Sequence, residues 1–143
     1  MAEIQSRTLP HQTIEVDWVA GEEFDAHRPG GPAIRLDGAA KSGPSPFDAL
    51  LAALATCAAT DVVSILQKQR TPPVALRVSV EARRVDATPK RLASAVLHFS
   101  IAAPGATTEK VARAVELSVT KYCSVRSSLI PDAPVTWTVE LSP

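Results

Sequence analysis

Several stretches of the chain alternate between apolar and polar residues with a period of two, which is typical of half-buried β-strands. In the first stretch, Ile14, Val16 and Trp18 face one way while Glu15 and Asp17 face the other. Turn-forming glycines and prolines separate many of these stretches, so most neighbouring strands are expected to pair as hairpins. The expected strands are residues 13–18, 23–27, 33–36, 74–80, 95–101 and 135–141.

Two longer segments have the pattern of helices. Residues 46–70 begin with a capping box, in which Ser45 is the N-cap and Asp48 the third helical residue. The interior of this segment is apolar almost all round, so we expect a long central helix that is buried in the middle of the protein. A second helix is expected over residues 107–121, and one or two helical turns are expected between residues 123 and 130.

The order of these elements is β-β-β-α-β-β-α-β, with mostly hairpin-linked strands. That order predicts an α+β fold with an antiparallel sheet and a long buried central helix. The 143 residues are 45% hydrophobic and 21% charged, which is typical of a folded domain. The sequence shows no repeat and no linker, so we expect a single domain over residues 1–143.

Charge and composition argue against several classes of protein. Basic and acidic residues both number 15, which argues against binding to nucleic acid. The apolar stretch over residues 49–66 is short for a membrane span and contains Asp61, so a core helix is the better interpretation. No basic segment leads into an apolar run near the N-terminus, so we expect a cytoplasmic protein with reduced thiols. The three histidines have no metal-binding spacing, and we expect neither a metal nor another cofactor.

The two cysteines are the strongest candidates for chemistry, although each also has a purely structural interpretation. Cys57 lies in mid-helix, where a free cysteine most often packs in the core, and a reactive thiol there would need a cation from elsewhere in the fold. Cys123 precedes an expected helical turn, whose N–H groups and Arg126 would favour its thiolate. Asp61, one turn after Cys57, is interpreted as structural because a close carboxylate would raise the pKa of the thiol. Local chemistry therefore favours Cys123.

Two segments resemble the cysteine motifs of the OsmC/Ohr family. Residues 43–57 begin Gly-Pro-Ser-Pro and end Leu-Ala-Thr-Cys, and with Asp-Val-Val-Ser-Ile-Leu at 61–66 they resemble the first motif. Residues 122–125, Tyr-Cys-Ser-Val, with Ser-Leu at 128–129, are similar to the second. The sequence of the first motif is most similar to that of a less characterised OsmC-like branch.

This resemblance implies a fold and a chemistry. Members of the family form intertwined homodimers, in which strands of both chains surround two central helices. The resemblance makes Cys57 the peroxidatic thiol, which attacks a hydroperoxide, and Cys123 the resolving thiol, which traps the sulfenic acid as a disulfide. The implied partners are a hydroperoxide substrate, an external dithiol reductant and a second copy of the chain. No membrane and no nucleic acid are expected as partners.

The sequence also departs from the better-studied branches of the family. Those branches carry an activating arginine in a Gly-Gly-Arg-like segment and a glutamate ten residues before the peroxidatic cysteine. Here residues 21–23 read Gly-Glu-Glu, and Phe47 occupies the position of the glutamate. The possible supporting residues are Asp48, Arg28, Arg35 and Arg126. Two alternatives therefore stay open beside the peroxidase: a non-catalytic protein that binds a hydrophobic small molecule, and a redox sensor.

Overall fold

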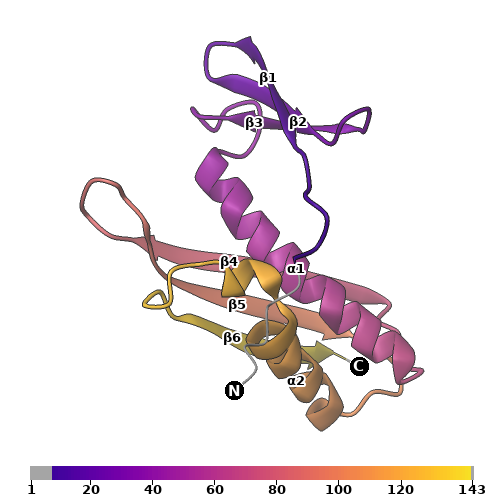
Figure 1. The fold of residues 1–143 in the computed structure, drawn as a ribbon. Coiled ribbons are helices and arrows are strands. Elements are labelled where there is room, and N and C mark those ends of the chain that lie inside the picture. The colour runs from indigo at the N-terminus through magenta and orange to yellow at the C-terminus, as the bar shows by residue number, and fades with distance from the viewer. Residues whose placement is uncertain (1–7, 143) are drawn as a thin grey trace, which may run out of the picture. The chain divides into compact units, whose positions relative to one another are not determined.

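The computed structural model describes residues 8–142, which form two compact units that meet in sequence between Ala49 and Leu50. The first unit is a three-stranded antiparallel sheet in the order β1 (Glu15–Ala20), β2 (Glu23–His27) and β3 (Ala33–Asp37). The second unit contains the long helix and a second three-stranded sheet (Figure 1). The expected α+β class is confirmed, and the extent of the single domain stays a prediction.

The first sheet has one apolar and one polar face, as its alternating sequence requires. The register of β1 and β2 places Val16 opposite Ala26 and Trp18 opposite Phe24. In β3, Ile34 lies opposite Ala26 and Leu36 lies opposite Phe24. We call this side the apolar face, and it consists of Val16, Trp18, Phe24, Ala26, Ile34 and Leu36. Trp18 is 67% exposed and Ile34 is 61% exposed, so much of the apolar face lies open.

The start of the long helix α1 (Pro46–Lys68) confirms the predicted capping box. The backbone N–H of Asp48 donates to Ser45 Oγ at 3.0 Å, and the backbone N–H of Ser45 donates to Asp48 Oδ2 at 2.9 Å. Two N–H groups at the helix start are thereby satisfied by side chains. Gly43 precedes the cap, and a Cβ at this position would lie 2.6 Å from the carbonyl oxygen of Arg35.

The second sheet corrects the prediction of purely antiparallel strands. β4 (Ala75–Arg84) and β5 (Leu92–Ala102) form the expected antiparallel hairpin, but β6 (Val135–Ser142) pairs with β5 in parallel. Parallel neighbours need a long crossover connection, and residues 103–134 provide one. The crossover contains α2 (Thr108–Leu117), the π-helical turn η1 (Ser118–Tyr122) and the short α3 (Ser124–Ser127).

The core of the second unit lies where the helices cover one face of this sheet (Figure 1). Every second residue of β5 from Ala95 to Ile101 is buried, and α2 contributes a stripe centred on Val111 and Val115. The stripe of α1 comprises Leu54, Ala58, Val62 and Leu66. We expected α1 to be buried on all sides. Residues of the same chain cover only this stripe, so that expectation is wrong for a single chain. By length and composition α1 would also be able to cross a membrane.

Candidate functional site

The structure brings the two cysteines together within the second unit. Cys57 lies on α1, and Cys123 lies between η1 and α3. The Cys123 thiol donates to the carbonyl oxygen of Leu54, with 3.9 Å between sulfur and oxygen, and Cys57 Sγ lies 3.7 Å from Ser124 Oγ. Each thiol also influences the pKa of the other, and neither cysteine forms a disulfide. The predicted thiol pair is therefore present as one cluster.

The two sulfurs differ in how far solutes can reach them. Cys123 is only 3% exposed and packs among core residues, whereas Cys57 is half-buried. Cys57 is the thiol that an incoming molecule meets first, and this order does not depend on thiol acidity.

The environment of Cys57 favours its thiolate without a cation. Burial raises the pKa of the Cys57 thiol, but hydrogen bonds from the backbone N–H of Val125, the Ser124 hydroxyl and the Cys123 thiol outweigh it. The backbone N–H of Ser124 lowers this pKa further, and the net pKa lies below its ordinary value. The start of α3 thus supplies oriented N–H groups to a cysteine of another helix, and the cationic partner expected for Cys57 stays a prediction.

The environment of Cys123 acts in the opposite direction. Burial raises the pKa of the Cys123 thiol, the backbone N–H of Arg126 lowers it, and the adjoining Cys57 sulfur raises it again. Cys123 does cap α3, since Arg126 N–H donates to its sulfur at 3.4 Å, but its net pKa lies above the ordinary value. The expectation that Cys123 is the more activated thiol is therefore wrong, because burial outweighs the helix start.

The possible supporting residues have other roles in the structure. Arg126 acts on the cluster through its backbone N–H, and its side chain lines a separate pocket with Leu129 and Ile130. Arg28, Arg35 and Asp48 belong to the first unit, whereas both cysteines belong to the second.

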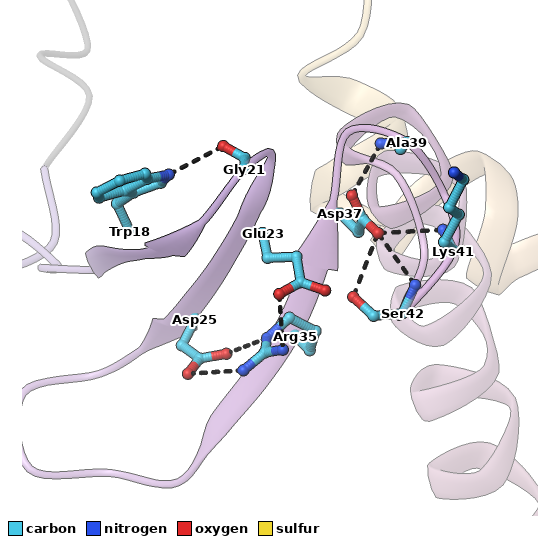
Figure 2. A network of polar contacts seen from close by, with 9 residues as sticks. All are labelled: Trp18, Gly21, Glu23, Asp25, Arg35, Asp37, Ala39, Lys41 and Ser42. Carbon is cyan, nitrogen blue, oxygen red and sulfur yellow. Dashed lines mark hydrogen bonds and ion pairs between the residues drawn. The ribbon is translucent and has the colours of Figure 1, made fainter.

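Arg35 and Asp48 are engaged within that first unit. Figure 2 shows the Arg35 guanidinium between Asp25, at 2.6 Å, and Glu23, at 3.6 Å. Asp48 closes the capping box with Ser45. Arg28 is exposed at the end of β2. Of the predicted site residues, the structure thus groups Cys57, Cys123 and the backbone of Arg126.

Sequence reasoning missed Ser124 and the N–H of Val125 as partners of Cys57. The available signal was the expected helical turn after Cys123, which was assigned to Cys123 alone. Within residues 8–142, no three His, Cys, Asp or Glu side chains are placed to hold a metal ion.

Comparison with known proteins places the chain in a family. The family model described as "OsmC-like protein" matches residues 38–140, which include both cysteines and their hydrogen-bond partners. The chain belongs to the OsmC-like protein family. It is 37% identical to protein YhfA of Escherichia coli K12, over 88% of this chain and 95% of that one.

Solved structures show the same OsmC-like fold. An OsmC-like protein of Mycoplasma pneumoniae is 18% identical with a TM-score of 0.79, covering 94% of this chain and 99% of that one. The organic hydroperoxide resistance protein OhrB of Bacillus subtilis is 12% identical with a TM-score of 0.60, covering 93% of this chain and all of that one.

Proposed function

We propose that this OsmC-like protein is a thiol-dependent hydroperoxide reductase, in which Cys57 attacks the peroxide and Cys123 resolves the product. The observation that carries the proposal is the pairing of a half-exposed thiol of lowered pKa with a buried thiol of raised pKa. A thiolate is the nucleophile that attack on a peroxide requires, and an adjacent thiol traps the sulfenic acid before further oxidation.

The reaction follows from the two environments. The Cys57 thiolate attacks one peroxide oxygen, the O–O bond breaks, and the other oxygen leaves with its organic group and takes up a proton. Cys57 is then a sulfenic acid, and the Cys123 sulfur displaces its hydroxyl as water to form the disulfide. An external dithiol supplies two electrons, is itself oxidised to a disulfide, and restores both thiols.

The fold likeness to OhrB, an organic hydroperoxide resistance protein, supports an organic hydroperoxide as the substrate. The site itself supports a peroxidase that uses backbone N–H groups and Ser124 where the better-studied branches use an arginine. We propose further that the chain acts as a homodimer, as the family resemblance implies, since much of the apolar face is exposed in a single chain.

Mass spectrometry after one equivalent of cumene hydroperoxide tests the proposal. We expect a Cys57–Cys123 disulfide in the wild-type chain within seconds to minutes. Cys57→Ser should consume no peroxide, whereas Cys123→Ser should accumulate a sulfenic acid on Cys57 that dimedone captures. If both wild-type thiols stay reduced while the peroxide persists, the proposal is wrong.

Peroxide consumption and ligand binding, measured on the same variants, separate the alternatives. A redox sensor would form the disulfide but would not sustain peroxide consumption when excess dithiothreitol is present. A binding protein would form no disulfide, and Cys57→Ser would leave its ligand binding intact.

A further inference from the structure

The peroxide step proposed above needs a hydrogen-bond donor as well as a thiolate. When the sulfur attacks a hydroperoxide, the O–O bond breaks and negative charge develops on the departing oxygen. An alkoxide is a poor leaving group, so a donor placed at this oxygen lowers the barrier of the step. Cys57 is not that donor, because it reacts as the thiolate. Cys123 is 3% exposed and its thiol donates to the carbonyl oxygen of Leu54, so an incoming peroxide does not meet it.

Ser124 carries a donor that faces the reacting sulfur. Its hydroxyl oxygen lies 3.7 Å from Cys57 Sγ, and Ser124 is exposed while Cys57 is half-buried, so a solute reaches both groups. Among residues 8–142 this hydroxyl has no other hydrogen-bond partner. The backbone N–H groups of Ser124 and Val125 also act on Cys57, but their peptide planes fix the direction of these donors. A hydroxyl hydrogen rotates about its C–O bond, so it can turn from the sulfur to another acceptor nearby.

The distance between Ser124 and Cys57 suits a peroxide that lies beside both. Before reaction, the attacked oxygen lies about 3 to 3.5 Å from the sulfur nucleophile. The second oxygen then lies one bond further out, on the far side from the sulfur. A hydroxyl 3.7 Å from the same sulfur is placed to donate to that second oxygen at about 2.5 to 3.0 Å. The donor therefore lies close to the atom on which charge develops.

We propose that Ser124 is a catalytic residue of the peroxide step, whose hydroxyl turns from the Cys57 sulfur and donates to the departing oxygen of the hydroperoxide. The inference rests on the proposed function and goes beyond the effect of Ser124 on the pKa of Cys57. In the resting site the hydroxyl stabilises the thiolate. As the negative charge moves from the sulfur to the leaving group, the same hydroxyl follows that charge.

Electrons and protons balance in this step. The Cys57 sulfur gives an electron pair to the terminal oxygen, which keeps its hydrogen, and the S–O bond of the sulfenic acid forms. The O–O bond breaks, and its electron pair stays on the departing oxygen. That oxygen takes the Ser124 proton and leaves as an alcohol, and Ser124 recovers a proton from the solvent, because it is exposed. Cys57 is oxidised by two electrons and the hydroperoxide is reduced by two.

Two oxidants with different leaving groups test this inference. Cumene hydroperoxide releases a strongly basic alkoxide, whereas peracetic acid releases acetate, a weak base that needs no donor to leave. With each oxidant in excess, loss of the free Cys57 thiol is followed at pH 7 by quenching with an alkylating agent and mass spectrometry. In Ser124→Ala, the rate constant for cumene hydroperoxide divided by that for peracetic acid should fall at least about tenfold. This ratio cancels the thiolate fraction, which a raised Cys57 pKa lowers equally for both oxidants.

Two further variants control the comparison. Ser124→Thr restores a hydroxyl and should return the ratio to within about threefold of the wild-type value. Ser127→Ala removes an exposed serine from the same short helix and should leave both rate constants unchanged. If Ser124→Ala slows both oxidants equally, Ser124 acts on the thiolate alone, and the inference is wrong. A ratio in Ser124→Thr as low as that in Ser124→Ala would likewise exclude the hydroxyl as the donor.

The outcome is separable from that of the proposed function. A wild-type Cys57 that stays reduced in excess cumene hydroperoxide contradicts the proposed function, and the inference fails with it. A wild-type Cys57 that reacts, together with an unchanged ratio in Ser124→Ala, supports the proposed function and overturns the inference alone.

Discussion

At the scale of single residues, Ser124 is the side chain whose removal best tests the account of Cys57. Its hydroxyl lies 3.7 Å from the Cys57 sulfur and helps to lower the pKa of that thiol. In Ser124→Ala the N–H groups remain and the hydroxyl is lost, so the pKa should rise and the thiolate fraction at pH 7 should fall. Alkylation of Cys57 by iodoacetamide should then slow about threefold to tenfold, since a hydrogen bond to a charged group is lost.

The pH profile of alkylation is the decisive measurement for Ser124. The midpoint for Cys57 should move to higher pH in Ser124→Ala and return in Ser124→Thr, which restores a hydroxyl. Ser127→Ala, an exposed serine of the same short helix, should leave the midpoint unchanged. An unchanged midpoint in Ser124→Ala would show that the backbone N–H groups act alone.

The lowered pKa of Asp37 predicts that the fold loses stability in acid. Backbone N–H groups of Ser42, at 3.0 Å, and Ala39, at 2.9 Å, hold its pKa at about 2, against burial, and Figure 2 shows this cradle. A pKa lowered in the folded state stabilises the fold above the unfolded pKa of about 4, and that contribution is lost as the pH falls from about 4 to 2.

The measurement for Asp37 is the urea midpoint from circular dichroism at pH 7 and pH 2.5. Asp37→Asn should lower the midpoint at pH 7, and its difference from wild type should narrow at pH 2.5. Asp86→Asn, a change in the exposed β4–β5 loop, should show neither effect. A constant difference for Asp37→Asn at both pH values would contradict this assignment.

The sequence named Cys57 and Cys123 as candidate site residues, but local chemistry ranked their acidity in the opposite order to the structure. Cys57 and Cys123 were found by motif, and their proximity agrees with the family resemblance. The ranking failed because local sequence shows only a residue's own helix, whereas the N–H groups that favour Cys57 come from residues 67 and 68 positions later. Burial of Cys123, which reverses its expected acidity, also depends on packing that no local pattern reports.

At the scale of elements, the junction between β3 and α1 depends on a glycine. A Cβ at Gly43 would lie 2.6 Å from the Arg35 carbonyl oxygen, a contact that only backbone movement can relieve. Gly43→Ala should therefore lower the free energy of unfolding by about 2 kcal/mol, measured by urea titration. Pro44→Ala keeps the Pro44 carbonyl that accepts the N–H of Asp37, and it should cost less than about 1 kcal/mol. Equal losses in the two variants would show that the close approach at Gly43 is not limiting.

The elements themselves were largely predictable from sequence. Alternation and turn signals located the six strands of the described residues, and the capping box at Ser45 and Asp48 marked the start of α1 to the residue. The parallel pairing of β5 with β6 was missed, because alternation reports which face a residue occupies and not which neighbour its strand chooses. The π-helical turn before Cys123 was also missed, since no composition distinguishes it from the end of an α-helix.

At the scale of the whole molecule, the open apolar surface is the feature that a single chain leaves unexplained. The apolar face exposes Val16, Trp18 and Ile34, each to more than half of its surface. Covering such surface contributes roughly 25 cal/mol per Å² removed from water, which favours association. The dimer proposed for this OsmC-like protein would cover it with a second copy.

A charge on the apolar face tests that dimer. Trp18→Glu would bury a carboxylate in the interface, so the variant should elute as a monomer of 15.1 kDa, whereas the wild-type chain should show twice that mass by light scattering. Glu15→Lys changes a charge on the opposite face of the same strand and should leave the dimer intact. Circular dichroism of Trp18→Glu must show retained secondary structure for the result to count as dissociation. A wild-type monomer at high micromolar concentration, or a folded Trp18→Glu dimer, would contradict association through this face.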